Sequence, residues 1–203
     1  MEVTSADPLS WRERKKLQTR DALSWAVIRL SVERGWGNVT VEDAAAAASV
    51  SERTFRNYFT SKAEAVAARH RDRMLHIAAE LRSHPPGEPL WDAITSAVAT
   101  QFAGGQPQGR SWNDAIQLML TEPDVAGEFL KANAAAQRDL AVAIAERTGT
   151  DPAHDLYPTL VAAAITAATT TAMDHWLRAD PPVALEDLVR EAFSQLRAGL
   201  PVP

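Results

Sequence analysis

The chain of 203 residues contains no cysteine. This absence excludes disulfide bonds and thiolate metal sites, and it fits a reducing cytoplasm. A membrane-spanning helix needs about 18 or more apolar residues in a row. The most apolar stretch, LVAAAITAATTTAM at residues 160–173, is too short and too rich in threonine to meet that need. The start, MEVTSADPLSWRERKK, has no apolar run after its charges, so we expect no secretion signal. These absences predict a cytoplasmic protein without a membrane partner.

Alternating β-branched residues are also scarce, whereas alanine is abundant and Pro/Gly clusters recur at helix-length intervals. The pattern predicts an all-α protein with about nine helices. The expected helices cover residues 11–34, 40–48, 61–82, 90–102, 112–120, 125–147, 155–177 and 183–200. One further short helix, the third in chain order, should start at Ser51.

Charge is distributed unevenly along the chain. The net charge is −5, yet residues 1–84 carry 14 Lys/Arg against 11 Asp/Glu, whereas residues 85–203 carry 7 against 15. Chance is one explanation for this asymmetry; the other is that only the first part meets a polyanion. The break HPPGEP, His84 to Pro89, coincides with the change of sign. We therefore expect an N-terminal domain at 1–84 and a second domain at 85–203.

The segment SVSERTFRNYFTSKAEAV, residues 49–66, predicts a short helix held between two others. Thr40, Ser51 and Ser61 are N-cap candidates for three successive helices. Phe55 and Phe59 are four residues apart and share an inward face, which leaves polar side chains outside. Such a helix is too short to be stable alone, and it has the form of the second helix of a helix-turn-helix. A helical hairpin with a solvated polar face is the alternative.

The stretch from about Thr19 to Val66 resembles the DNA-binding domain of the TetR/AcrR family of bacterial transcriptional regulators. The similarity is carried by TRDAL…ERG, VTVEDAAAAASVS and RTFRNYFTSKAEAV. Three positions depart from the family pattern: Ser49 replaces a turn glycine, Ala44 a larger aliphatic residue and Arg56 an aromatic one. Ser49 is expected to adopt a positive φ at modest cost.

The resemblance implies a helix-turn-helix core at 19–66 and a connecting helix at 61–82. It assigns phosphate contacts to the start of the second helix, to Tyr58 and to Lys62, and base readout mainly to Arg53, Arg56 or Asn57. The full expected DNA-binding set is Thr40, Ser51, Arg53, Thr54, Arg56, Asn57, Tyr58 and Lys62. The basic arm at 11–20, with Arg12, Arg14, Lys15 and Lys16, is either a solvated helix end or a segment that reaches along the duplex or its minor groove.

For the second half, the resemblance implies a helical ligand-binding and dimerisation domain. The segments at 155–177 and 185–200 would form a homodimer interface; a monomer core is the alternative. The phrase from RTGTDPAHDLYP to MDHWL is similar to a subgroup with acyl-CoA-like effectors. Large side chains would either pack the core or line a cavity for a small hydrophobic or amphipathic effector: Trp91, Phe102, Trp112, Met119, Phe129, Tyr157, Met173 and Trp176.

The sequence does not favour an enzyme. GGQPQGRS, residues 104–111, approaches a phosphate-binding P-loop, but Arg110 replaces the required lysine and no strand precedes it. The five histidines are dispersed, so neither a metal nor a cofactor is expected. We expect a homodimeric repressor that binds a palindromic double-stranded DNA operator and is released by its effector. A ligand-independent structural DNA-binding protein and a nucleotide-binding enzyme are the alternatives.

Overall fold

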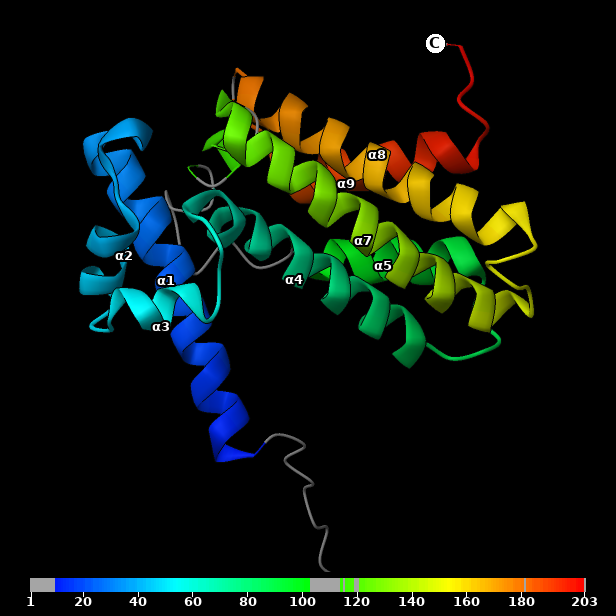
Figure 1. The fold of residues 1–203 in the computed structure, drawn as a ribbon. Helices are drawn as coiled ribbons and strands as arrows, with labels where there is room; N and C mark the ends of the chain where they lie inside the picture. Colours follow the sequence, from blue (N-terminus) through cyan, green and yellow to red (C-terminus); the bar gives the residue numbers. More distant parts are fainter. Residues whose placement is uncertain (1–9, 103–113, 115, 119–120, 181, 203) are drawn as a thin grey trace, which may run out of the picture.

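The computed structural model describes residues 10–102, 114, 116–118, 121–180 and 182–202, and these residues contain helices but no strand. Figure 1 shows their arrangement. Most of the predicted helix 112–120 and the P-loop-like segment 104–111 lie outside the described residues. The helices are α1 (Trp11–Arg34), the 3-10 helix η1 (Trp36–Asn38), α2 (Val41–Ala47), α3 (Glu52–Arg56), α4 (Lys62–Ser83), α5 (Leu90–Thr100), α7 (Pro123–Thr148), α8 (Leu156–Arg178) and α9 (Leu185–Arg197).

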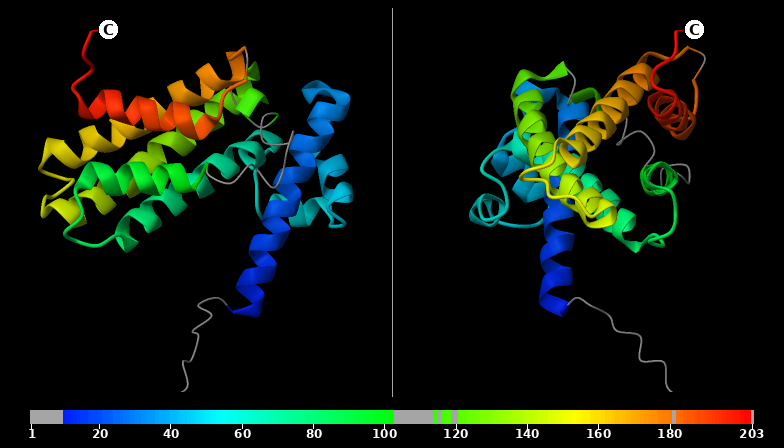
Figure 2. Two further views of the ribbon diagram at one scale, coloured as in Figure 1. Left: turned by 180° about the vertical axis from the view of Figure 1, so that it is seen from behind. Right: turned by 90° about the vertical axis from the view of Figure 1, so that its right-hand side faces the viewer.

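Helices α1, α2 and α3 gather at one end of the molecule, and α4 runs from them into a bundle with α5, α7, α8 and α9 (Figures 1 and 2). The all-α prediction is therefore confirmed. The division into two domains at residue 84 stays a prediction, because α4 packs both on α1 and on α7.

The centre of the bundle is the pair α4 and α7, which pack on each other more extensively than any other two described helices. Both bury many alanines, and such small side chains let helix axes approach closely. The buried alanines are Ala63, Ala65, Ala67, Ala68 and Ala78 on α4, and Ala136, Ala141, Ala143 and Ala145 on α7. One continuous apolar core links this pair to the other helices.

Helix α8 corrects one expectation from the sequence. It extends over 23 residues, so by length and mean hydropathy it could cross a membrane. In the fold, however, it packs between α7 and α9 and buries a stripe that includes Val161, Ile165 and Met173. A core helix of a globular protein has the same features.

The predicted loop between α4 and α5 is present, and hydrogen bonds fix its backbone to α7. Arg147, near the end of α7, donates hydrogen bonds from its two terminal nitrogens to four backbone carbonyls in and around this loop. The acceptors are Leu81 O at 3.3 Å, His84 O at 2.8 Å, Pro85 O at 3.0 Å and Glu88 O at 3.1 Å. The planar guanidinium suits such a cluster of acceptors. The end of α4 is thereby fixed to the end of α7.

Candidate nucleic-acid interface

Helix α2 starts with the predicted capping box. The Thr40 hydroxyl accepts from the Asp43 N–H at 3.1 Å, and the Asp43 carboxylate accepts from the Thr40 N–H at 2.9 Å and hydroxyl at 2.7 Å. These bonds, the hydroxyl first, hold the pKa of Asp43 below its usual value. The N–H groups of Val41 and Glu42 keep no acceptor among the described residues, so this helix start can receive a phosphate oxygen.

The turn between α2 and α3 is a Schellman motif. Val50 N–H donates to Ala45 O and Ser49 N–H to Ala46 O, both at 3.0 Å. The motif requires a left-handed residue after the helix, and Ser49 supplies it with φ at 57°. The expectation of a positive φ at a non-glycine residue is confirmed. The turn fixes the direction in which α3 leaves α2.

Helix α3 is anchored by two aromatic rings. Phe55 and Phe59 are buried, with ring centroids 5.7 Å apart. Tyr58 is half-buried beside Phe59. The Arg20 guanidinium of α1 lies 5.4 Å from the centre of the Phe59 ring. The inward face predicted from the four-residue spacing is therefore confirmed.

The outward face of α3 carries the residues predicted to read bases, but only some of their side chains are held by other groups of the chain. Ser51 accepts from the Thr54 N–H at 3.1 Å, and the two hydroxyls lie 2.9 Å apart. Arg56 is paired with Glu52 through its Nε at 2.9 Å and a terminal nitrogen at 2.6 Å. Arg53 and Asn57 are exposed, and within the described residues no group binds the Arg53 guanidinium. The surface therefore favours Arg53 and Asn57 for base contacts.

Lys62 has a structural role that the sequence did not show. Its ammonium donates to the carbonyls of Trp36 and of Val39, the latter at 3.0 Å, and lies 4.1 Å from the centre of the Trp36 ring. Burial lowers its pKa, while Asp124 and Glu122 act in the opposite direction. An ammonium has three N–H donors. One of them remains for the phosphate contact that the resemblance implies.

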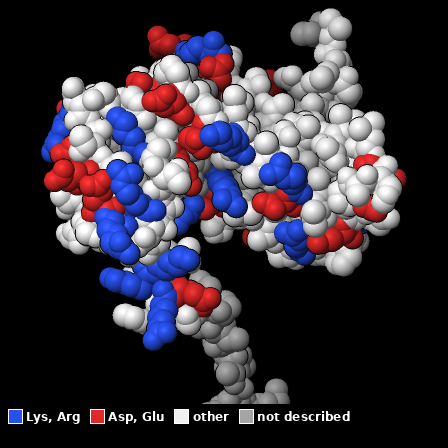
Figure 3. Space-filling view, viewed as in Figure 1, with Lys and Arg blue, Asp and Glu red and all other residues white. Residues whose placement is uncertain are grey.

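The basic arm is the helical start of α1, which projects from the body (Figures 1 and 2). Ser10 and Glu13 cap it reciprocally, and residues 11–18 are all exposed. Figure 3 shows Lys and Arg gathered over this projection. An α-helix is about 10–12 Å wide with its side chains, and the B-DNA minor groove is about 6 Å wide. The helix can therefore lie along phosphates without deforming the DNA, whereas entry into the minor groove would require the groove to widen.

The predicted ligand-binding residues do not share one environment. Phe102, Phe129 and Met173 are buried, and Trp91 and Trp176 are half-buried. Tyr157 lies on the surface of α8, 45 % exposed beside Leu156 and Leu160. Trp112 and Met119 lie outside the described side chains. The set as a whole does not form one described pocket.

Helix α7 makes two polar contacts in the bundle that the sequence analysis missed, one of them beside Phe129. The His70 ring packs on Phe129 with centroids 4.4 Å apart, and its Nε2 lies 2.7 Å from Asn133 Oδ1. Burial lowers the His70 pKa from 6.5 to about 4. Four residues along α7, Gln137 donates to Thr166 of α8 at 2.8 Å. The i, i+4 spacing of Asn133 and Gln137, which puts both amides on one face of an amphipathic helix, was the signal available in the sequence.

The connection between α1 and α4 is polar. Arg20 pairs with Asp72, and Arg69 pairs with Asp21 at 2.7 Å while its guanidinium lies 4.5 Å from the centre of the Trp25 ring. These two ion pairs join the helix that supports α2 and α3 to the central helix of the bundle. A change at this junction would therefore reach the DNA-facing helices.

The comparisons with known proteins agree with this geometry. Residues 88–201 match the model of the MftR C-terminal domain, and residues 26–68 match that of bacterial regulatory proteins of the tetR family. The HTH-type transcriptional regulator TcmR of Streptomyces glaucescens is 30 % identical over 197 residues, covering 93 % of this chain and 87 % of TcmR. The putative mycofactocin biosynthesis transcriptional regulator MftR of Mycobacterium tuberculosis is 25 % identical over 187 residues, covering 92 % of this chain and 93 % of MftR.

A solved structure shows the same fold. The putative TetR-family transcriptional regulator from Syntrophomonas wolfei superposes with a TM-score of 0.66 at 16 % identity, covering 92 % of this chain and 98 % of that one. The family models and the sequence relatives together extend over both the helix-turn-helix and the helical bundle. The chain therefore belongs to the TetR family of bacterial DNA-binding transcriptional regulators.

Proposed function

We propose that the protein is a cytoplasmic repressor that binds a palindromic operator as a homodimer and releases it when a small hydrophobic or amphipathic effector binds the bundle. The observation that carries the DNA-binding part is the geometry of α3. Phe55 and Phe59 fix the helix from inside, while Arg53 and Asn57 stand free on its outer face. Arginine and asparagine can read guanine and adenine edges bidentately in the major groove.

The test is selection of binding sites from random double-stranded DNA, followed by affinity measurements on the selected site. Arg53→Ala and Asn57→Ala should each lose about 1–3 kcal/mol on the selected site and much less on random DNA. Arg138→Ala, an exposed arginine of α7, is the matched control and should bind as the wild type does. Equal losses of both α3 variants on selected and random DNA would assign base readout elsewhere.

The arm at the start of α1 would add contacts to phosphates. Replacing Lys15 and Lys16 by glutamine should weaken binding to selected and random DNA alike and lower the salt slope by about 1–2. An unchanged salt slope would leave the arm as a solvated helix end.

The uncharged face of α8 supports the homodimer. Leu156 and Leu160 are 75 % and 58 % exposed, and Figure 3 shows few charged atoms along this helix except near its end. Ala168 packs against the core of its own chain, so a charge there would also disturb the monomer. Leu160→Glu is the sharper test, because it places a charge on the exposed face.

Sedimentation of the full chain decides the point. The wild type should sediment as a dimer, and Leu160→Glu as a folded monomer with an unchanged helical spectrum. Val32→Glu places the same charge on an exposed apolar position of α1 and is the control. A dimeric Leu160→Glu variant would put the interface on another face.

An acyl-CoA-like effector remains part of the proposal. The buried Phe102, Phe129 and Met173 offer apolar surface, and His70 with Asn133 offers hydrogen-bonding groups. A long-chain acyl-CoA should lower the affinity for the selected operator, because one coupling free energy links the two sites. Operator binding that no small molecule alters would favour the ligand-independent structural protein instead.

A further inference from the structure

A groove with a volume of about 540 Å³ lies between the helix-turn-helix and the start of α7. One wall is formed by the segment that leads into α2 and by the start of α4, and the other by the start of α7. The lining residues are Trp36, Val39, Thr40, Val41, Thr60, Ser61, Lys62 and Ala63 on the first wall, and Asp124 and Glu128 on the second. The groove therefore includes two groups to which the family resemblance assigns phosphate contacts, the start of α2 and Lys62.

The first wall of the groove attracts anions. The N–H groups of Val41 and Glu42 at the start of α2 have no acceptor among the described residues, and a helix start carries partial positive charge. The Lys62 ammonium keeps one N–H after it donates to two backbone carbonyls. A DNA phosphate and a carboxylate of the protein itself are both anions that these groups attract.

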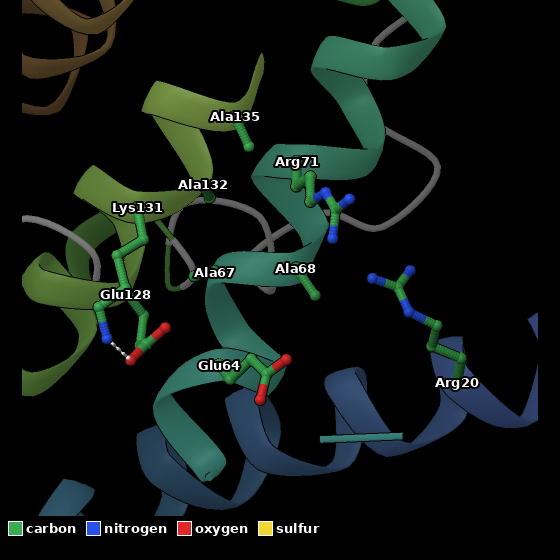
Figure 4. A pocket seen from close by; sticks show the side chains of 9 residues that line it. All are labelled: Arg20, Glu64, Ala67, Ala68, Arg71, Glu128, Lys131, Ala132 and Ala135. Atoms are coloured by element: carbon green, nitrogen blue, oxygen red, sulfur yellow. Dashed lines mark hydrogen bonds and ion pairs between the residues drawn. The ribbon is translucent and has the colours of Figure 1, made fainter. Parts of the chain in front are cut away.

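The start of α7 brings carboxylates to the opposite wall. Asp124 is exposed and Glu122 is half-buried, and within the described part of the chain neither side chain forms an ion pair or a hydrogen bond. Glu122 is the N-cap residue of α7, yet its side chain makes no cap hydrogen bond. Glu128, by contrast, is paired with Lys131 at 2.7 Å (Figure 4). The charges of Asp124 and Glu122 therefore act on the groove without a direct counter-ion.

These carboxylates act on Lys62 across the groove. Burial lowers the pKa of Lys62, whereas Asp124 and then Glu122 oppose that effect, because a nearby negative charge favours the ammonium form. Lys62 forms no direct ion pair with either of these two carboxylates. A phosphate that approaches Lys62 therefore enters the field of the same carboxylates and is repelled by them.

We propose that Asp124 and Glu122 form an electrostatic brake on DNA binding, in which the start of α7 attracts Lys62 and repels the phosphate that Lys62 and the start of α2 would bind. The inference rests on the proposed function and deepens it by naming an inhibitory contact within the fold. The brake acts on a phosphate, so it lowers the affinity for all DNA sequences and leaves base readout by α3 unchanged. Because Asp124 is exposed, salt screens its effect.

The test measures the affinity of full-length variants for the selected operator and for random DNA. Asp124→Asn removes the charge and keeps a side chain of the same size. It should bind both DNAs about three- to tenfold more tightly than the wild type at about 50 mM salt, and the gain should shrink at about 300 mM. Asp124→Lys should exceed the gain of Asp124→Asn. A gain confined to the selected operator would place Asp124 at a base and overturn the brake.

Asp139 provides the matched control on the same helix. It lies 15 residues after Asp124, which is about 22 Å along α7 and beyond the reach of a charge in about 0.1 M salt. Asp139→Asn and Asp139→Lys make the same changes of net charge and should bind DNA as the wild type does. Equal gains in the Asp124 and Asp139 variants would reduce the effect to net charge and overturn the brake.

A purely structural role for Asp124 predicts a different result. A carboxylate in the first turn of a helix stabilises that helix, so Asp124→Asn would then lower the melting temperature and leave DNA affinity unchanged. That outcome in a folded variant overturns the proposal. Glu122→Gln keeps the test valid if Asp124→Asn fails to fold, because the Glu122 side chain makes no cap hydrogen bond. Its DNA affinity should also rise, by less than that of Asp124→Asn, and an unchanged affinity contradicts the brake.

The pKa of Lys62 tests the attraction without DNA. Nuclear magnetic resonance titration follows the lysine side chains, and the signal that Lys62→Arg removes belongs to Lys62. Asp124→Asn should lower the Lys62 pKa, because it removes the carboxylate that favours the ammonium form, whereas Asp139→Asn should leave it unchanged. An unchanged Lys62 pKa in Asp124→Asn overturns the brake.

DNA selectivity separates the brake from the proposed function. A wild type that prefers its selected operator, with no gain of affinity in Asp124→Asn, overturns the brake and leaves the function standing. A wild type that binds selected and random DNA equally overturns the sequence-specific repressor. In that case tighter binding of Asp124→Asn to both DNAs, with a lower Lys62 pKa, still supports the brake.

Discussion

The Lys62 ammonium lies 4.1 Å from the centre of the Trp36 ring and donates to the carbonyl of the same residue. It also donates to Val39 O at 3.0 Å. One side chain at the start of α4 thus caps the 3-10 turn that leads into α2. The position that the family resemblance assigns to a phosphate contact also holds the helix-turn-helix onto the central helix.

Lys62→Ala should therefore destabilise the fold as well as weaken DNA binding. Hydrogen bonds to a charged group are worth about 1.5–3 kcal/mol, and the half-buried position places the expected loss near the lower end. Urea unfolding measures it, with the exposed Lys131→Ala as control. An unchanged unfolding free energy would show that Lys62 serves DNA alone.

Glu52→Gln should strengthen DNA binding. Glu52 holds the Arg56 guanidinium on the surface of α3, and an exposed i, i+4 pair of this kind contributes only about 0.3–0.5 kcal/mol to stability. Removing the carboxylate frees Arg56 and deletes a negative charge from the surface that is proposed to face the duplex. Affinity for selected and random DNA should rise and the salt slope should steepen by about 1. If Glu52→Gln instead bound the selected DNA more weakly than the wild type does, Glu52 itself would contact a base.

Ser49→Gly should stabilise the protein. The residue sits at the left-handed position of the Schellman turn, where a side chain is strained and glycine is not. The gain should be up to about 1 kcal/mol, because glycine also has more freedom in the unfolded chain. Thermal unfolding checks it, with Ala48→Gly, at a position with negative φ, expected to destabilise. A lower melting temperature for Ser49→Gly would contradict the strain.

His70 should make stability depend on pH. Its pKa is about 4 in the fold against 6.5 when unperturbed, so the unfolded chain binds the extra proton first as the pH falls. The free energy of unfolding that depends on neutral His70 is fully present above about pH 6.5. It falls progressively as the pH drops towards 4, by about 3 kcal/mol in all. His70→Gln retains an amide near Asn133 and should flatten this part of the profile. If the stability of the wild type and that of His70→Gln fell in parallel with pH, other groups would cause the acid sensitivity.

Features set by neighbouring residues were the ones that sequence could predict. The caps at Thr40, Ser51 and Ser61, the positive φ of Ser49 and the buried Phe55–Phe59 pair all follow from spacings of a few residues. The boundaries of the described helices could be predicted for the same reason, because nearby capping and turn residues set them. The contact residues on α3 remain predictions, although their exposure is now known.

The missed features join residues that are far apart in the chain. The carbonyls that Lys62 binds lie 26 and 23 residues before it, and those that Arg147 binds lie about 60 residues before it. Nothing in a local pattern distinguishes such a cation from a solvated one. The pairing of His70 with Asn133 spans 63 residues and depends on how α4 and α7 are aligned.

Arg147 also bears on how a tilt of α4 would be transmitted. Its four hydrogen bonds tie the C-terminal end of α4 to α7, so a tilt about this end would be carried along the helix as far as Lys62. Its 22 residues span about 33 Å. A tilt of about 5° therefore carries the far end through about 3 Å, the length of a hydrogen bond. In the proposed homodimer, a small effector-driven movement in the bundle would therefore be enough to take the two α3 helices out of step with the turns of DNA.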